Sequence, residues 1–295
     1  MKSIFLLPCL AACCTTFAQS TMPSTDIFIM KMSSNKAGKY SFSAPQNVTM
    51  REGYDNQPCF TANSKAILFT SIREDRQADV YRYNIRHKTT VRLTATPESE
   101  YSPTITPDGK YFSTVRVEKD STQRLWKFPF SGEAPELILG NIDSVGYHCW
   151  IDNNILALFI LTKPFSLYIG DLNNGLAGQQ ADNIGRSIQK AGGQRTLAYV
   201  DKKDSTAWMI HFLMLNMQKD IPVVKTLQGC EDFAVGKDGT LFMGKEGKLY
   251  KFTPEKDSDW EQIADFSKTV GNFYRIAISP NGKRIALVAY SGKMP

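Results

Sequence analysis

The sequence predicts an all-β protein, a six-bladed β-propeller built from four-stranded blades. Two motifs that recur along the chain support this prediction, and so do the two chain ends, which each resemble half a blade. Long segments with apolar residues three and four apart are scarce, which argues against helices. With 295 residues and 42% hydrophobic content, the chain is long enough for one large globular domain or two modest ones.

The first recurrent motif is a strand, a tight turn and a second strand. In residues 102–115, alternating apolar residues lead into a Pro-Asp-Gly corner, and an apolar-rich segment leaves it. Proline presets the backbone angle that enters such a turn, and glycine accepts the positive angle that leaves it. The motif therefore predicts a β-hairpin. Variants of it recur in residues 58–70, 233–243 and 276–288.

The second motif is an aromatic residue among alternating polar and apolar residues, as expected for the third strand of a blade. The aromatic residues are Phe28, Tyr81, Trp126, Tyr168, Trp208 and Tyr250. After the first step they lie 40 to 45 residues apart. A period of about 40–45 residues with four short strands is typical of a β-propeller. The corners at 152–153 and 192–193 lack Asp-Gly, but the strands beside them keep the pattern.

The two ends of the chain complete the ring. The C-terminal region contains a first and a second strand, at 274–279 and 284–290, whereas the N-terminal region begins with a third-strand pattern at 27–32 and a fourth strand after it. Neither half can cover its edges alone. We expect the N-terminal outer strands to pair with the C-terminal inner strands, so that residues 26–295 form a single six-bladed domain after a short linker at 19–25.

Residues 1–18 have the pattern of a secretory signal peptide. Lys2 precedes a short apolar segment at 4–12, and small residues follow. Cleavage after Ala18 would release a soluble periplasmic or secreted protein. Alternatively, the sequence that ends at Cys13 resembles a bacterial lipobox, and Cys13 would then carry a lipid anchor. In both cases the protein leaves the cytoplasm, and the sequence contains no segment long and apolar enough to span a bilayer.

Composition and motifs argue against several classes of function. Beyond the predicted leader, Cys59, Cys149 and Cys230 are odd in number and widely spaced, which argues against a disulfide scaffold or a zinc site. Lys and Arg number 35 against 29 Asp and Glu, without a dense basic run, so nucleic-acid binding is not expected. The sequence has no Gly-x-Ser-x-Gly elbow and no glycine-rich phosphate loop, so a hydrolase nucleophile and a nucleotide site are unsupported.

The hairpin at residues 103–110, together with Arg92-Leu93-Thr94 at the end of the preceding unit, resembles the propeller repeats of TolB-like proteins. Similar repeats occur in the propellers of prolyl-oligopeptidase-type peptidases. The resemblance covers about residues 26–290 and is strongest in blades one, two and six. It implies the fold, whereas propellers host many unrelated functions. TolB carries an additional α/β domain before its propeller and the peptidases carry a hydrolase domain, and we expect neither in this chain.

Aromatic and polar residues recur where the predicted inner strands begin. We predict that these residues meet at one mouth of the central channel and bind a peptide or a protein loop. They are Tyr54, Asp55, Tyr101, Tyr147, His148, Asp232, Tyr274 and Arg275. The alternative is that the tyrosines pack between neighbouring blades. Among the three histidines, His148 is the one expected on an inner strand, where a structural role competes with a position facing the channel.

The predicted function is that of an exported, non-enzymatic binding module in the bacterial cell envelope. It would be a monomer without a cofactor, holding its loops in a fixed geometry that lowers the ordering cost of binding. By the resemblance, its partners would be envelope proteins such as a peptidoglycan-associated lipoprotein.

Two other hypotheses stay open. A calcium-dependent hydrolase or lyase would place oxygen ligands around a calcium ion in the channel. The candidate ligands, which do not recur at one repeat position, are Glu52, Asp55, Asn56, Glu100, Asp143, Glu231, Asp232 and Asn272. A glycan-binding module is the second alternative.

Overall fold

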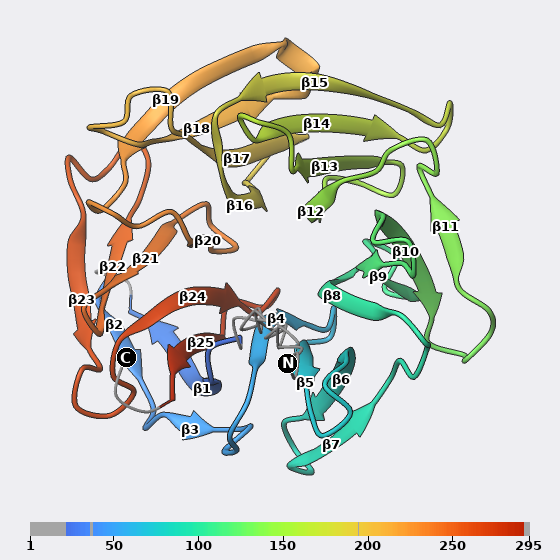
Figure 1. Cartoon of the computed structure of the whole chain (residues 1–295). Coiled ribbons are helices and arrows are strands. Elements are labelled where there is room, and N and C mark those ends of the chain that lie inside the picture. Colours follow the sequence, from blue (N-terminus) through green and yellow to red (C-terminus); the bar gives the residue numbers. More distant parts are fainter. Residues whose placement is uncertain (1–21, 36–37, 194, 292–295) are drawn as a thin grey trace, which may run out of the picture.

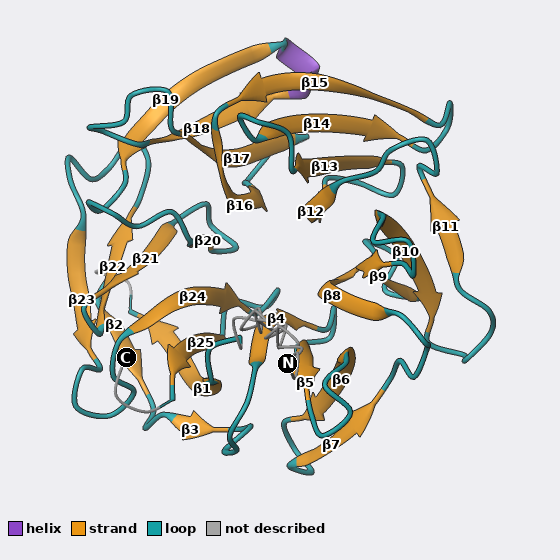
Figure 2. Ribbon diagram, in the orientation of Figure 1, coloured by secondary structure: helices purple, strands orange, loops and turns teal. Residues whose placement is uncertain are grey.

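The structure, a computed structural model, describes residues 22–35, 38–193 and 195–291. Six antiparallel sheets stand around a central axis, and the chain passes through them in order around the ring (Figure 1). The prediction of an all-β, six-bladed propeller is confirmed. In the described residues the one helix is the short 3-10 segment η1 (Leu215–Met217), and no helix is long and apolar enough to cross a bilayer (Figure 2). The predicted leader at 1–18, with Cys13, lies outside the described residues.

Five blades are each formed by four consecutive strands, counted here from the channel outward. Blade 1 contains β4 (Asp55–Phe60), β5 (Ala66–Ile72), β6 (Ala78–Asn84) and β7 (Thr89–Arg92). Blade 2 contains β8 (Ser99–Ile105), β9 (Tyr111–Val117), β10 (Gln123–Pro129) and β11 (Glu136–Ile138). Blade 3 contains β12 (Val145–Trp150), β13 (Ile155–Ile160), β14 (Ser166–Asp171) and β15 (Leu176–Asp182). Blade 4 contains β16 (Ile184–Lys190), β17 (Thr196–Asp201), β18 (Met209–Met214) and β19 (Lys219–Lys225). Blade 5 contains β20 (Phe233–Val235), β21 (Leu241–Lys245), β22 (Lys248–Phe252) and β23 (Glu261–Asp265).

Blade 6 joins the two ends of the described chain, as predicted. Its inner strands are β24 (Phe273–Ile278) and β25 (Arg284–Tyr290), and β1 (Thr25–Ser34) continues the sheet outward. The β1–β25 pairing runs from Thr25 opposite Tyr290 to Lys31 opposite Arg284. The outermost position differs from the single predicted strand, because two short strands, β2 (Tyr40–Phe42) and β3 (Gln46–Asn47), share the edge of β1.

Turn chemistry explains why the hairpin motif recurs. At the corner of blade 2, the carboxylate of Asp108 accepts hydrogen bonds from Thr106 Oγ1 at 2.6 Å and from the Lys110 backbone amide at 3.0 Å. Gly109 follows with a φ of 70°, which glycine adopts without steric cost. Such side-chain bonds fix the turn between the first two strands of a blade, so that the inner strand is held at the channel.

Apolar side chains fill the space between blades. One cluster, for example, packs Phe159 and Leu167 of blade 3 against Ile184, Leu197 and Tyr199 of blade 4. All five side chains are at most 3% exposed. Because interiors packed in this way resist deformation, the six inner strands form a rigid wall around the channel.

Candidate binding site in the central channel

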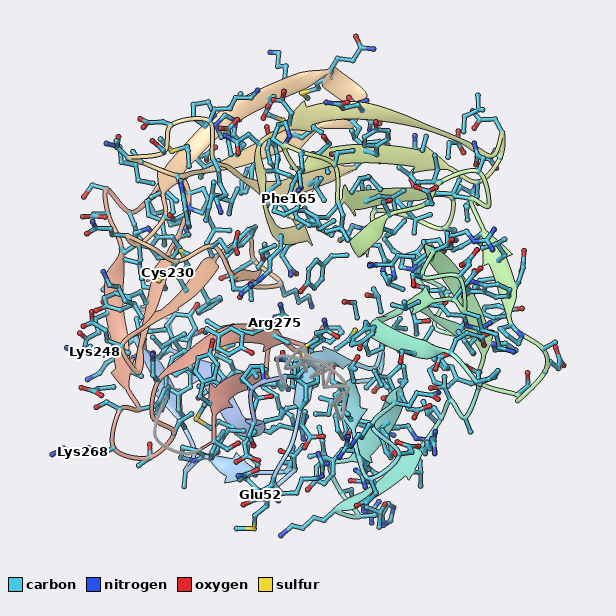
Figure 3. The ribbon with its side chains drawn as sticks, viewed as in Figure 1. Glu52, Phe165, Cys230, Lys248, Lys268 and Arg275 are labelled. Atoms are coloured by element: carbon cyan, nitrogen blue, oxygen red, sulfur yellow. The ribbon has the colours of Figure 1, made fainter. Side chains whose placement is uncertain are left out.

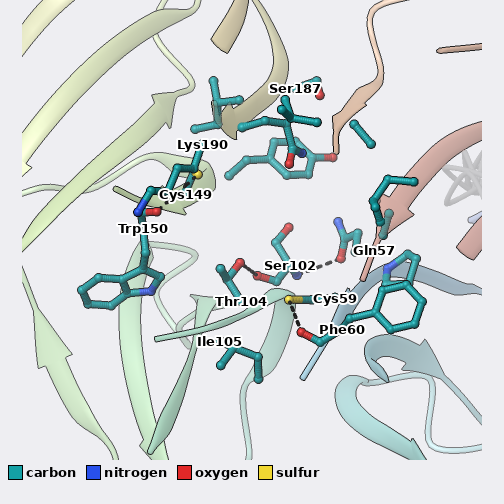
Figure 4. Close-up of a pocket in the computed structure, with 18 of the residues that line it drawn as sticks. Gln57, Cys59, Phe60, Ser102, Thr104, Ile105, Cys149, Trp150, Ser187 and Lys190 are labelled. Atoms are coloured by element: carbon teal, nitrogen blue, oxygen red, sulfur yellow. Dashed lines mark hydrogen bonds between the residues drawn. The ribbon is translucent and has the colours of Figure 1, made fainter. Parts of the chain in front are cut away.

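The six inner strands enclose one pocket of about 580 Å³. Every blade contributes to its lining, through β4, β8, β12, β16, β20 and β24. The pocket extends from residues near the start of the inner strands, such as Tyr147 and Arg275, to the turns that follow those strands, near Ala62 and Pro280. Figure 4 shows a close-up of the pocket, with Cys59 and Cys149 in the lining.

The inner strands are irregular near their starts, and these irregularities matter for the site. Five of the six inner strands shift register with the second strand of their blade. In β12 the shift lies between Val145 and Tyr147, and in β24 it lies between Phe273 and Arg275. A β-bulge re-aims the side chains beside it. Tyr147 and Arg275, each at the end of such a shift, both line the pocket.

Polar side chains bridge the channel at this level. Blades 3 and 6 are opposite one another in the ring, yet Arg275 Nη2 donates a hydrogen bond of 3.3 Å to Tyr147 Oη. Arg275 Nη1 donates to Asn56 Oδ1 at 3.3 Å, and Asn56 Nδ2 donates to Tyr274 Oη at 2.6 Å. Figure 3 shows Arg275 near the middle of the ring. We call this layer the channel floor; it comprises Asn56, Tyr147, Arg186, Asp232, Tyr274 and Arg275.

Ion pairs connect the floor residues that blades 4 and 5 contribute. Arg186 binds the carboxylate of Asp232 with two hydrogen bonds, one of them 3.0 Å from Nε to Oδ1. Glu231 lies beside this pair, 3.5 Å from Arg186 Nη1 and 3.3 Å from Lys202 Nζ. Burial by itself lowers the pKa of Arg186, but the hydrogen bonds and charge of Asp232 outweigh burial and raise the pKa. Arg186 is therefore firmly cationic.

Most of the predicted rim residues meet at or beside the floor. Tyr147, Asp232, Tyr274 and Arg275 belong to it. Tyr54 is buried beside it: burial raises the pKa of its hydroxyl, and the charge of Arg275 opposes that rise. Tyr101 is half-buried, and it adds to the rise in the Tyr54 pKa.

Asp55 and His148 are buried within and between blades. Asp55 is fully buried and accepts a hydrogen bond of 2.8 Å from Arg51 Nη1. His148 Nε2 lies 2.6 Å from Ser113 Oγ of blade 2, which also accepts a hydrogen bond from Trp150 Nε1 at 2.8 Å. Burial lowers the pKa of His148 to about 3, so the imidazole is neutral. His148 thus lies in the pocket lining and also packs between blades 2 and 3.

The half of the pocket nearer the turns has different chemistry. Its lining includes the small or apolar side chains of Cys59, Ile105, Cys149, Ile188 and Ile278 (Figure 4). Burial raises the pKa of the Cys149 thiol to about 12, and it also raises the pKa of Cys59. Both thiols are therefore protonated at neutral pH and act as small apolar groups.

The candidate calcium ligands are dispersed. Asn56, Glu231 and Asp232 lie at or beside the floor, whereas Asp55 and Glu100 are fully buried. Glu100 accepts a hydrogen bond of 3.2 Å from the Nε of Arg116. In the part of the chain that the structure describes, no three His, Cys, Asp or Glu side chains are grouped so as to hold a metal ion.

The sequence reasoning missed Arg186 and Lys202. Arg186 is the third residue of β16, as Tyr147 is the third residue of β12 and Arg275 the third residue of β24. Alignment of the inner strands by this position would have found it. The corner at 192–193 lacks the Asp-Gly signal that fixes the register elsewhere, which is why the correspondence was not visible.

Comparison with solved structures shows which known fold this chain shares. No protein-family model matches the sequence, and no curated protein matches it. Among solved structures, a protein described as TolB from Agrobacterium tumefaciens superposes with a TM-score of 0.71, covering 92% of this chain and 100% of that one at 12% identity. The chain has a TolB-like six-bladed propeller fold.

Two further structures share this fold. TolB from Acinetobacter baumannii gives a TM-score of 0.61 at 13% identity, over 90% of this chain and 64% of that one. An oligogalacturonate lyase from Vibrio parahaemolyticus gives a TM-score of 0.54 at 13% identity, over 91% of this chain and 100% of that one. The TolB-like architecture is thus shared by proteins of different function, in keeping with the general separation of fold and function.

Proposed function

We propose that this TolB-like protein is an exported, non-enzymatic binding scaffold of the bacterial cell envelope, and that its channel pocket receives a segment of a partner protein. The observation that carries the proposal is the pocket itself. It has about 580 Å³ and is lined by all six inner strands. It has a polar floor at one end, and toward the other its walls combine apolar side chains such as Ile105 and Ile278 with a few polar ones such as Thr104. Concave sites with mostly apolar walls and a few convergent polar groups are typical binding sites.

The rigidity of the wall supports binding rather than a moving catalytic device. The lining residues belong to strands that are paired within their blades and packed against neighbouring blades. A site formed in advance loses little conformational entropy when its ligand arrives. An extended segment suits this pocket, because its side chains can contact the walls while its polar groups reach the floor.

The proposed partner and compartment rest on the resemblance to TolB-like proteins and on the predicted leader. The fold supports a partner among envelope proteins, such as a peptidoglycan-associated lipoprotein. Residues 1–18 would direct export, with cleavage after Ala18 for a soluble periplasmic protein or lipidation at Cys13 for an anchored one.

The test is to block the pocket without unfolding the propeller. Gln189 of β16 lines the pocket and is half-buried, so Gln189→Trp would fill part of it. Gln180 of β15 is exposed on the outer strand of blade 3, so Gln180→Trp is the matched control. Affinity-tagged full-length protein is produced in the bacterium that encodes it, and bound envelope proteins are quantified by mass spectrometry. We expect one partner to fall at least about tenfold with Gln189→Trp and to persist with Gln180→Trp.

Equal capture by all three proteins would contradict the proposal. Thermal unfolding of both variants accompanies the capture, so that a drop caused by unfolding is recognised. A partner lost equally from both tryptophan variants would place the binding surface outside the channel, and the proposal would fail.

An enzyme in the channel is the second candidate, favoured by the fold shared with an oligogalacturonate lyase. It predicts that purified protein depolymerises an acidic oligosaccharide when calcium is present and that chelation stops the reaction. Turnover that Gln189→Trp abolishes would replace the scaffold proposal with this one. Binding to a glycan array without turnover would favour the glycan-binding hypothesis.

A further inference from the structure

Arg275 is a buried cation without a carboxylate of its own. Its side chain is 14% exposed, and its guanidinium donates hydrogen bonds to the neutral groups of Tyr147 and Asn56. The nearest carboxylate in the described residues belongs to Asp232, whose Oδ1 is 4.0 Å from Arg275 Nη2. Arg186 already binds both oxygens of that carboxylate. A buried charge is stable when it is paired, so Arg275 is short of an anion.

The charges around the floor do not balance. Arg186, Lys202 and Arg275 are cations, and Glu231 and Asp232 are the carboxylates within 4.0 Å of them. One positive charge is in excess. Since Arg275 lines the pocket, a ligand in the pocket can supply the missing negative charge.

The opposite end of the pocket is also positive. Five of the six blades carry a lysine in or directly beside the turn that follows the inner strand. They are Lys65, Lys110, Lys190, Lys237 and Lys283. All five are exposed, and none forms an ion pair with the described residues. The acidic residues of these turns, Asp108 and Asp238, accept hydrogen bonds from backbone amides of their own turns. These exposed lysines around the end of the pocket should raise the local concentration of an anionic ligand there.

We propose that the pocket recognises a carboxylate, that Arg275 pairs with it, and that the ligand is an acidic peptide segment whose apolar side chains contact the walls. The inference rests on the proposed function, because it names the chemistry of the segment that the pocket binds. Arginine pairs with carboxylates through two parallel hydrogen bonds. The walls combine partly exposed apolar side chains, such as Ile105 and Ile278, with hydrogen-bonding ones, such as Thr104 and Gln189, and a peptide carries both apolar side chains and backbone groups that match them.

The carboxylate has two sources, the C-terminus of a chain and an Asp or Glu side chain. A pool of random hexapeptides with free C-termini and the same pool with amidated C-termini are each incubated with full-length protein. Bound peptides are quantified by mass spectrometry. We expect retention of peptides with a free C-terminus if the chain end binds, and retention of Asp- or Glu-containing peptides from both pools if a side chain binds. In either case, peptides without any carboxylate are not retained.

The variant Arg275→Met tests the role of the guanidinium. Methionine keeps much of the apolar volume, and Asp232 keeps its bonds to Arg186, so the fold is expected to persist. We expect retention to fall about tenfold or more in Arg275→Met and to be partly kept in Arg275→Lys, which preserves the charge. If Arg275→Met fails to fold, two other comparisons still test whether Arg275 binds a carboxylate. They are retention by wild type against Arg275→Lys, and retention of free against amidated peptides.

Each contrary outcome has its own meaning. Retention of neutral amidated peptides that Gln189→Trp blocks would support the proposed function and overturn the carboxylate inference. Unchanged retention in Arg275→Met would do the same. Binding of a galacturonate trimer through Arg275, with no peptide retained, would replace the peptide with an acidic sugar. Retention of nothing by wild-type protein would overturn the inference, whereas the capture experiment would still test the proposed function separately.

Discussion

The two ends of the central channel are formed by the same six strands but differ in chemistry. Near the strand starts, Tyr147, Asp232 and Arg275 belong to the polar floor, where the side chains bind one another. Near the turns, the partly exposed Ile105 and Ile278 line open space, and exposed lysines surround it. A side chain that is already bonded within the protein contributes to stability, whereas one that faces open space is available to a ligand. The bonds within the floor should therefore stabilise the fold, whereas the ligand should be selected by the walls together with Arg275, the floor cation that has no carboxylate of its own.

Both ends of the channel depend on closure of the ring through blade 6. Loss of this closure should have the largest effect on the stability of the protein. Deleting residues 26–49 removes most of β1 and all of β2 and β3, leaving the edge of β25 and one face of blade 6 uncovered. We expect most of the stability to be lost, so that a cooperative thermal transition is absent. Calorimetry of the deletion variant checks this. A cooperative transition close to that of the wild type would show that five blades suffice.

Asp232→Ala should break the floor while sparing the walls. The substitution leaves Arg186 without its bidentate partner and Arg275 without its nearest carboxylate. Because the Arg186 side chain is 35% exposed, this pair is only partly buried, and removing one partner should cost about 1–3 kcal/mol. Gln189→Ala in the wall should change stability by less than about 0.5 kcal/mol. Chemical denaturation of both variants measures the difference, and equal effects would remove the distinction between floor and wall.

Acid should destabilise the protein through His148, which lies between blades 2 and 3. Its pKa is about 3 in the folded protein and about 6.5 in the unfolded chain, so the unfolded chain binds the extra proton between these values. The neutral His148 therefore has no effect on the pH dependence above about pH 6.5, and the free energy of unfolding falls as the pH is lowered from 6.5 toward 3. At pH 4.5 the loss should be about 2–3 kcal/mol. Denaturation midpoints at both pH values check this, and His148→Asn should show a smaller dependence. An identical dependence in that variant would assign the acid sensitivity to other groups.

Tyr147→Phe should have a smaller effect on stability than Asp232→Ala. It removes the hydroxyl that accepts a hydrogen bond from Arg275 and should cost about 1 kcal/mol. The matched control is Tyr168→Phe, whose hydroxyl makes a long 3.5 Å contact with the exposed Gln179, so its change should be near zero. Denaturation of the two variants side by side measures the contribution of the floor. A greater loss in the control would contradict the importance of the bridge across the channel.

The fold could be predicted largely from turn chemistry. Residues such as Thr106, Asp108 and Gly109 bond to their own turn, so the signal is local and survives in one sequence. The closure of blade 6 was predictable because each half had an uncovered edge. The split of its outer position into β2 and β3 was not, since it depends on how both segments share the edge of β1.

The site was predictable only in part. Tyr147, Asp232, Tyr274 and Arg275 were found because they lie where inner strands begin. The bond between Tyr147 and Arg275 was not predictable, since it joins opposite blades and depends on bulges that re-aim both side chains. His148 lies in the pocket lining, but its bond to Ser113 of blade 2 was not predictable, since that contact joins neighbouring blades.

Site-specific photo-crosslinking tests the central claim most directly. A photoreactive aliphatic amino acid, with a side chain close to that of glutamine in size so that the pocket stays open, is introduced at Gln189 in the pocket wall and, in a second protein, at Gln180 on the outer strand, and both are irradiated in the intact envelope. If the channel receives a partner segment, one envelope protein should crosslink from position 189 and not from position 180. The crosslinked peptide should carry a free C-terminus or an acidic side chain. Crosslinks from position 180 alone, or equal crosslinks from both positions, would contradict the account.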